Sequence, residues 1–290
     1  ELLDRPVIRD PSFRAAVTAI HRGDVAGLER LLDAEPRLLR ERIAEPDCYR
    51  EAGRPQYFRD PKLFWFIANN PTLMEAMPPS LAEIARAMIA RGVAREDLDY
   101  TLALLMTSAP AREQGFQGPL ARILLEAGAV PTEEAILTTL GHRELAPVEL
   151  LLERGHPMTA AIAAGLGRED RLGELLAGAP PEEVQTALGM AVINGHVRAA
   201  RMALDAGADP DAFLPVHSHS VPLHQAALDE NLELIDLLLS RGARADVRDK
   251  LWNGTPRDWA VHAGKQRSVA RLDAVSGPAE TETGPDTPGR

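Results

Sequence analysis

The 290-residue sequence is poor in cysteine, in aromatic residues and in long hydrophobic runs. Its one cysteine, Cys48, excludes an internal disulfide framework and favours a reducing compartment, so we expect a cytoplasmic protein. No apolar run approaches the ~20 residues that a membrane-spanning helix needs, so we expect no membrane partner. Aromatic residues make up only 4% of the chain, so any cluster of them calls for an explanation.

Positive charge is also scarce. The chain carries 32 Lys and Arg against 43 Asp and Glu, which gives a formal net charge of −11. Proteins that bind nucleic acid through its phosphates carry clustered cations, so we expect no nucleic-acid partner. The acidic balance favours a protein or peptide partner with basic patches. The chain does have an ordinary share of apolar residues, 45%, which is enough for a buried core.

Two kinds of short helix alternate along the chain. One kind, clearest at 120–129 and 234–243, has apolar residues at i, i+3 and i+4 and a glycine that suits the left-handed end of a helix. The other kind, as at 222–227, is rich in alanine and precedes the first. In the last copy, Thr255 is a natural N-cap and Asp258 can complete a capping box. A single pair cannot bury its apolar face, so the pairs are expected to stack.

These patterns resemble a known family. The run Pro-Leu-His-Gln-Ala-Ala at 222–227, followed by three leucines at 237–239 and Gly-Ala at 242–243, resembles an ankyrin repeat. A second match is Asn-Gly-His at 194–196, followed by Ala-Gly-Ala-Asp at 206–209. The resemblance implies an all-α ankyrin-repeat solenoid of about seven helix-turn-helix units, with β-turn fingers mainly in the C-terminal repeats.

The resemblance is specific over 182–274 and weaker but periodic over 13–177. The chain departs from the family pattern at Val221, where threonine is usual, at Arg257, where leucine is usual, and at Gly189, which replaces a histidine. The missing threonine removes a hydrogen bond that braces a loop, whereas the stacking of helix pairs does not depend on it.

The spacing of the inner-helix ends predicts where fingers occur. Successive ends at Gly141, Gly167 and Gly195 are 26 and 28 residues apart, which predicts tight loops without a finger. The next intervals, to Glu230 and then to Gly264, are 35 and 34 residues and leave room for a β-turn finger.

The predicted domain covers 1–275 and includes an irregular, aromatic-rich insertion at about 41–70. The remainder, 276–290, is rich in Gly, Pro, Thr and Glu and has no large apolar residue. Such a segment cannot bury enough surface to offset the entropy of ordering, so a disordered tail is expected.

The resemblance implies non-catalytic recognition of a protein or peptide through the concave groove and the fingers. Alignment on the closing glycine places Met190, Gln225 and Trp259 in one groove-facing row and Asn194 and Asp229 in a second row, one turn later. A rigid row of this kind suits an extended peptide or a helix.

Half of the aromatic residues lie between Tyr49 and Phe66, and from this cluster we predict partner contacts by Tyr57, Phe58 and Trp65. Its alternative role is a small core beneath the irregular segment. Trp252 falls in a predicted finger, where an exposed indole is a good anchor for a partner.

His217 and His219 raise the one metal question. In an extended segment, residues i and i+2 point to one side, so two imidazoles there can share a metal ion. The conceivable third ligands are Asp211, Asp229 and His262. The other reading is that both are solvated finger histidines that contact a partner, whereas His224 matches the family's structural histidine.

Two rival functions stay open beside protein recognition. One is an enzyme that uses the groove with a metal at His217 and His219, although the sequence shows no phosphate-binding loop and no nucleophile elbow. The other is a carrier of a small apolar ligand, bound near Ile136, Ile162 and Met190. Protein recognition, the preferred function, needs no cofactor.

Overall fold

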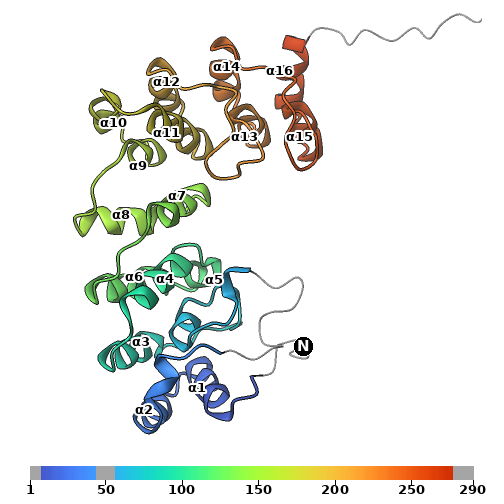
Figure 1. The fold of residues 1–290 in the computed structure, drawn as a ribbon. Coiled ribbons are helices and arrows are strands. Elements are labelled where there is room, and N and C mark those ends of the chain that lie inside the picture. The colour runs from blue at the N-terminus through green and yellow to red at the C-terminus, as the bar shows by residue number, and fades with distance from the viewer. Residues whose placement is uncertain (1–7, 44–55, 277–290) are drawn as a thin grey trace, which may run out of the picture. The chain divides into compact units, whose positions relative to one another are not determined.

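The structure is a computed structural model that describes residues 8–43 and 56–276 (Figure 1). Within these residues the regular secondary structure is helical, apart from an isolated antiparallel β-bridge between Arg42 and Lys62. No helix of this part is both long enough and apolar enough to cross a bilayer. The chain divides into two compact units, unit 1 (Glu1–Pro157) and unit 2 (Met158–Arg290). Of the predicted tail, only Ser276, the last residue of a helix, lies within the described residues.

Unit 1 stacks pairs that each have an inner and an outer member. The inner row runs α1, η3, α4, α7 and the outer row α2, α3, α6, α8, and each member contacts the next in its row. The bounds are α1 Pro11–Arg22, α2 Val25–Ala34, η1 Pro36–Leu39, η2 Gln56–Phe58, η3 Leu63–Ala68, α3 Leu81–Ala90, α4 Arg95–Met106, α5 Ala109–Glu113, α6 Gln117–Glu126, α7 Glu133–Gly141 and α8 Leu145–Glu153.

The described part of the predicted insertion has a definite place in this stack. The 3-10 helix η3 takes an inner position, with all six of its residues buried. Asn69 follows it in the left-handed conformation, and its side-chain oxygen accepts hydrogen bonds from the backbone N–H groups of Leu73 and Met74, both at 2.8 Å. Most of the cluster's aromatic residues therefore build core.

Unit 2 repeats the two-row arrangement with four pairs. The inner row runs α9, α11, α13, α15 and the outer row α10, α12, α14, α16, and again neighbours within each row are in contact (Figure 1). The bounds are α9 Ala160–Gly165, α10 Glu169–Leu176, α11 Pro181–Ile193, α12 Val197–Asp205, α13 Pro222–Leu228, α14 Leu232–Ser240, α15 Pro256–His262 and α16 Gln266–Ser276. Counting both units, seven described pairs have an α-helical inner member and one has η3, so the predicted all-α solenoid is confirmed.

The predicted helix ends are present in unit 2. Gly195 and Gly264 close their inner helices with φ values of 80° and 70°, and Glu230 adopts the same conformation at 55° without being glycine. At the start of α15, Thr255 Oγ1 accepts from the N–H of Asp258 at 3.2 Å, and the Asp258 carboxylate accepts from the N–H of Thr255 at 2.9 Å. The capping box is thus confirmed.

Loop lengths in unit 2 follow the predicted spacing. The connection from α10 to α11 has only four residues, 177–180, and forms no finger. Two longer connections join later pairs: 206–221 before α13, here called finger 1, and 241–255 before α15, here called finger 2. These fingers carry the candidate site.

Candidate functional site: the paired fingers of unit 2

Finger 1 is fixed to α11 at two points. Gln185 holds its start, because the side chain donates to the carbonyl of Asp209 at 3.0 Å and accepts from the N–H of Asp209 at 2.8 Å. Farther along, Leu214 and Pro215 lie over Gly189, where an added Cβ would be 2.5 Å from Pro215 Cδ. Glycine at 189 therefore gives the finger room to fold against the helix, which accounts for the loss of the family's histidine there.

Finger 2 is organised by one buried carboxylate, Asp249. Its Oδ1 accepts from the backbone N–H groups of Leu251 and Trp252 at 2.8 and 2.7 Å, and its Oδ2 accepts from the N–H of Gly254 at 2.8 Å and from Trp259 Nε1 at 3.0 Å. Burial alone would raise the pKa of Asp249, but these four donors outweigh it and lower the pKa to about 2. The carboxylate thus stays charged and fixes the turn.

The two fingers are bonded to each other and to α13. The N–H of Lys250 donates to the carbonyl of His219 at 2.8 Å, and Lys250 Nζ lies 3.5 Å from the centroid of the Phe213 ring. Beneath them, His224 Nδ1 accepts from the N–H of Val221, and Nε2 makes a 3.0 Å hydrogen bond with the carbonyl of Gly254. Burial lowers the pKa of His224, which favours the neutral ring that this pair of bonds requires.

The paired fingers expose large apolar side chains. Trp252 is 69% exposed and Leu251 63%, while Phe213 is 37% exposed on finger 1. Trp252 is nevertheless in ring contact with His219, at 5.3 Å between centroids, and with the half-buried Trp259, at 5.7 Å. The surface made by Phe213, Leu251 and Trp252 is here called the finger tip.

The predicted inner row is only partly accessible. Met190 is completely buried on α11, next to the alanine-rich α9, and Gln225 is buried with its amide donating to Asp229 Oδ2 at 2.9 Å. The expectation that these two face a partner was wrong, because small residues let neighbouring inner helices close over them. Asn194 and Asp229 are half-buried and remain candidates.

The aromatic candidates of unit 1 divide in the same way. Phe58 and Trp65 are buried, so the expectation that they meet a partner was wrong. The indole of Trp65 donates to Asp97 Oδ1 at 3.1 Å, and Lys62 Nζ lies 2.7 Å from Asp97 Oδ2, so burial of the ring is tied to a buried ion pair. Tyr57 is 48% exposed and stays a candidate.

The histidines of finger 1, His217 and His219, lie close together. The ring centroids of His217 and His219 are 6.2 Å apart. Within residues 8–43 and 56–276, no group of three or more His, Cys, Asp or Glu side chains is placed to hold a metal ion. Zinc takes four protein ligands in structural sites and three protein ligands plus a water in catalytic ones, so the pair alone does not make such a site.

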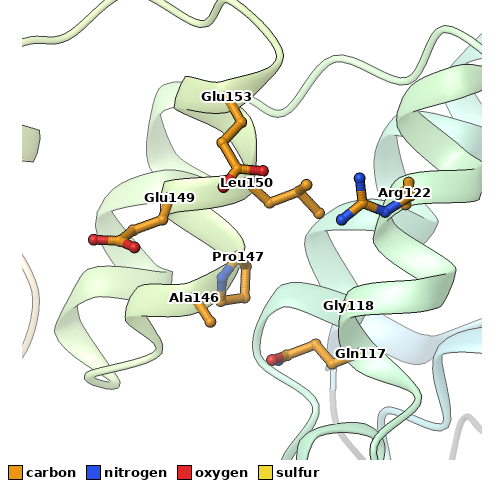
Figure 2. Close-up of a pocket in the computed structure, with 8 residues that line it drawn as sticks. All are labelled: Gln117, Gly118, Arg122, Ala146, Pro147, Glu149, Leu150 and Glu153. Carbon is orange, nitrogen blue, oxygen red and sulfur yellow. The ribbon is translucent and has the colours of Figure 1, made fainter.

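Unit 1 has a shallow hollow between its outer helices α6 and α8, with a volume of about 270 Å³ (Figure 2). Its lining residues are Gln117, Gly118, Arg122, Ala146, Pro147, Glu149, Leu150 and Glu153. The hollow forms where Gly118 faces the ring of Pro147, and it is open to solvent. A small apolar ligand needs a deeper, more enclosed site. The predicted ligand residues Ile136 and Ile162 are themselves buried.

Comparison with known proteins identifies the repeats. The family model described as ankyrin repeats (3 copies) matches residues 158–249, which fall in unit 2. Cyclin-dependent kinase 4 inhibitor B of Homo sapiens is 33% identical over 121 residues, 40% of this chain and 86% of that protein. The chain belongs to the ankyrin-repeat family. Cyclin-dependent kinase inhibitor 2A of Monodelphis domestica is a further relative, 37% identical over 118 residues, 39% of this chain and 67% of that protein.

This membership confirms the predicted function class, which is non-catalytic recognition of a protein. The sequence pattern missed two residues that matter for the ankyrin fingers. Asp249 was not predicted, although an Asp three residues before a Trp-Asn-Gly turn is a recognisable signal for side-chain bonds to the turn's N–H groups. Phe213 gave no signal, because its exposure depends on how finger 1 folds.

Proposed function

We propose that this ankyrin-repeat chain binds its protein partner through the finger tip of unit 2, with Trp252 and Leu251 as the main anchors. One observation carries the proposal: two large apolar side chains project into solvent from a turn that Asp249 holds by three backbone hydrogen bonds. Large anchors on a fixed backbone lose little conformational entropy on binding, and tryptophan is enriched among the hot spots of interfaces.

The inner helices supply polar groups for the same contact. Asn194 and Asp229 are half-buried residues of the inner row, and Trp259 joins that row to the tip through its contact with Trp252. Asp229, whose Oδ2 accepts from Gln225 Nε2 at 2.9 Å, adds negative charge to this row. Together with the net charge of −11, it favours a partner that carries basic patches on the surface facing the groove.

The relatives suggest the first class of partner to test. Two of them are, by name, inhibitors of cyclin-dependent kinases. We therefore propose a protein kinase domain as the first candidate, bound without a metal or cofactor. A cytoplasmic location is proposed because the chain has a single cysteine.

Site-specific photo-crosslinking in the native host tests this proposal. A photoreactive amino acid replaces Trp252 in one variant and Arg201, which is exposed on the outer helix α12, in a matched variant. We expect a crosslinked protein from position 252 only, and excess wild-type chain should suppress it while excess Trp252→Ala should not. Equal crosslinking from both positions, or none from 252, contradicts the proposal.

A further inference from the structure

The exposed charged residues beside the apolar anchors are positive, whereas the net charge of the chain is negative. Arg248 and Lys250 are both exposed and precede Leu251 and Trp252 in finger 2. Arg248 donates from Nη1 to the carbonyl of Asn253 at 2.7 Å, which places the guanidinium against the turn. Lys250 donates from Nζ to the carbonyl of Ser218 at 3.2 Å and lies over Phe213. Both cations are therefore held at the finger tip.

Three carboxylates near the tip are engaged with protein groups. Asp249 is buried under four donors, as described above. Asp258 caps α15 and accepts from both the N–H and the hydroxyl of Thr255. Asp211 forms a bidentate contact with the backbone N–H and the Nε of Arg244, both at 3.0 Å. Asp246, on the other limb of finger 2, is exposed. The charged side chains held against the turn and against Phe213 are thus Arg248 and Lys250.

We propose that the finger tip recognises an acidic, apolar protein segment, in which an aliphatic or aromatic side chain packs on Trp252 and Leu251 and flanking Asp or Glu residues pair with Arg248 and Lys250. The inference rests on the proposed function and adds the chemistry of the segment bound. Complementary charge around an apolar anchor fixes the register of a bound segment and speeds encounter. An anionic membrane offers similar chemistry, but a chain of net charge −11 is repelled from such a surface.

Selection from a library of random peptides of about 12 residues, displayed on phage, tests the proposal with the full chain as target. Enriched peptides are then synthesised and their Kd values measured against four chains: wild type, Trp252→Ser, Arg248→Glu and Arg201→Glu. The last variant makes the same charge change on an exposed arginine of α12. Circular dichroism of each variant verifies that it is folded.

We expect enriched peptides to combine Asp or Glu with Leu, Phe or Trp. Trp252→Ser should weaken their binding by about tenfold or more and Arg248→Glu by roughly threefold to tenfold, while Arg201→Glu should leave the Kd nearly unchanged. Raising the salt concentration should raise the Kd of the wild type toward that of Arg248→Glu, because salt screens exposed charge pairs.

Other outcomes separate the inference from the proposed function. Peptides that need Trp252 but carry basic or uncharged flanks overturn the inference and leave the finger tip as the binding surface. Peptides that bind wild type and Trp252→Ser equally, or a selection with no enrichment, overturn both. Binding to vesicles of anionic phospholipid that depends on Trp252 and exceeds peptide binding would assign the tip to a membrane instead.

Discussion

Replacing Asp249 with Asn is the sharpest perturbation of the finger architecture. The change keeps the size of the side chain and removes its charge. The remaining amide oxygen can still accept from two N–H groups, but the new NH₂ group would face the N–H of Gly254 and the indole of Trp259, both of which are donors. Two donors on half-buried residues would thus lose their acceptor.

The size of the effect follows from the pKa of Asp249. A carboxyl whose pKa is 3.8 in the unfolded chain and about 2 in the folded one stabilises the folded state by about 2 kcal/mol at neutral pH. Because the folded pKa is the lower one, this contribution is present above pH 3.8 and is lost as the pH falls toward 2. We expect Asp249→Asn to cost about 2–4 kcal/mol at neutral pH, with the unpaired donors included.

Urea unfolding measures the loss of stability in Asp249→Asn, and nuclear magnetic resonance follows the hydrogen bond from Trp259 to Asp249. Asp246→Asn is the matched control, since it removes an exposed carboxylate from the same finger and should cost less than about 0.5 kcal/mol. In the wild type, the indole N–H signal of Trp259 should shift with a midpoint near pH 2, as its acceptor is protonated. If the two variants are equally stable at neutral pH, or if the Trp259 signal is unchanged in Asp249→Asn, the reasoning is refuted.

Four further changes probe the rest of unit 2. Gly189→Ala should cost about 1–3 kcal/mol, because its Cβ would overlap Pro215, and unchanged thermal stability would mean that finger 1 shifts freely. Leu238→Ala removes a fully buried leucine and should cost about 2–5 kcal/mol, whereas a loss below about 1 kcal/mol in urea unfolding would contradict its place in the core. Trp252→Ala should keep helical content and stability within about 0.5 kcal/mol while weakening partner binding, and collapse by circular dichroism would assign the indole to the core. Burial lowers the pKa of His224 below 6.5, so the unfolded chain binds more protons at this residue than the folded chain does. The free energy of unfolding should therefore fall as the pH drops below 6.5. His224→Gln should lose less stability than the wild type between about pH 7.5 and about pH 5.5, and an equal loss would exclude this origin.

Features set by local spacing could be predicted from the sequence. The capping box of Thr255 and Asp258 depends on residues three apart, and the four-residue loop before α11 follows from the distance between helix ends. Trp252 was predicted on a finger for the same reason. These features need no knowledge of distant neighbours.

Burial across pairs could not be predicted in this way. Met190 and Gln225 occupy the groove-facing register, yet their exposure depends on how closely neighbouring inner helices approach. Trp65 and Phe58 are buried because η3 occupies a position in the inner row. No helical periodicity in the sequence indicated that position. The role of Asp249 required the indole of Trp259, ten residues away, to meet it.

Hydrogen exchange of the chain with and without its captured partner tests the central claim most directly. If the finger tip is the binding surface, amides of 209–221 and 244–255 should exchange more slowly in the complex, and Trp252→Ala should abolish that protection. Protection confined to unit 1, with both fingers exchanging as in the free chain, would contradict the account.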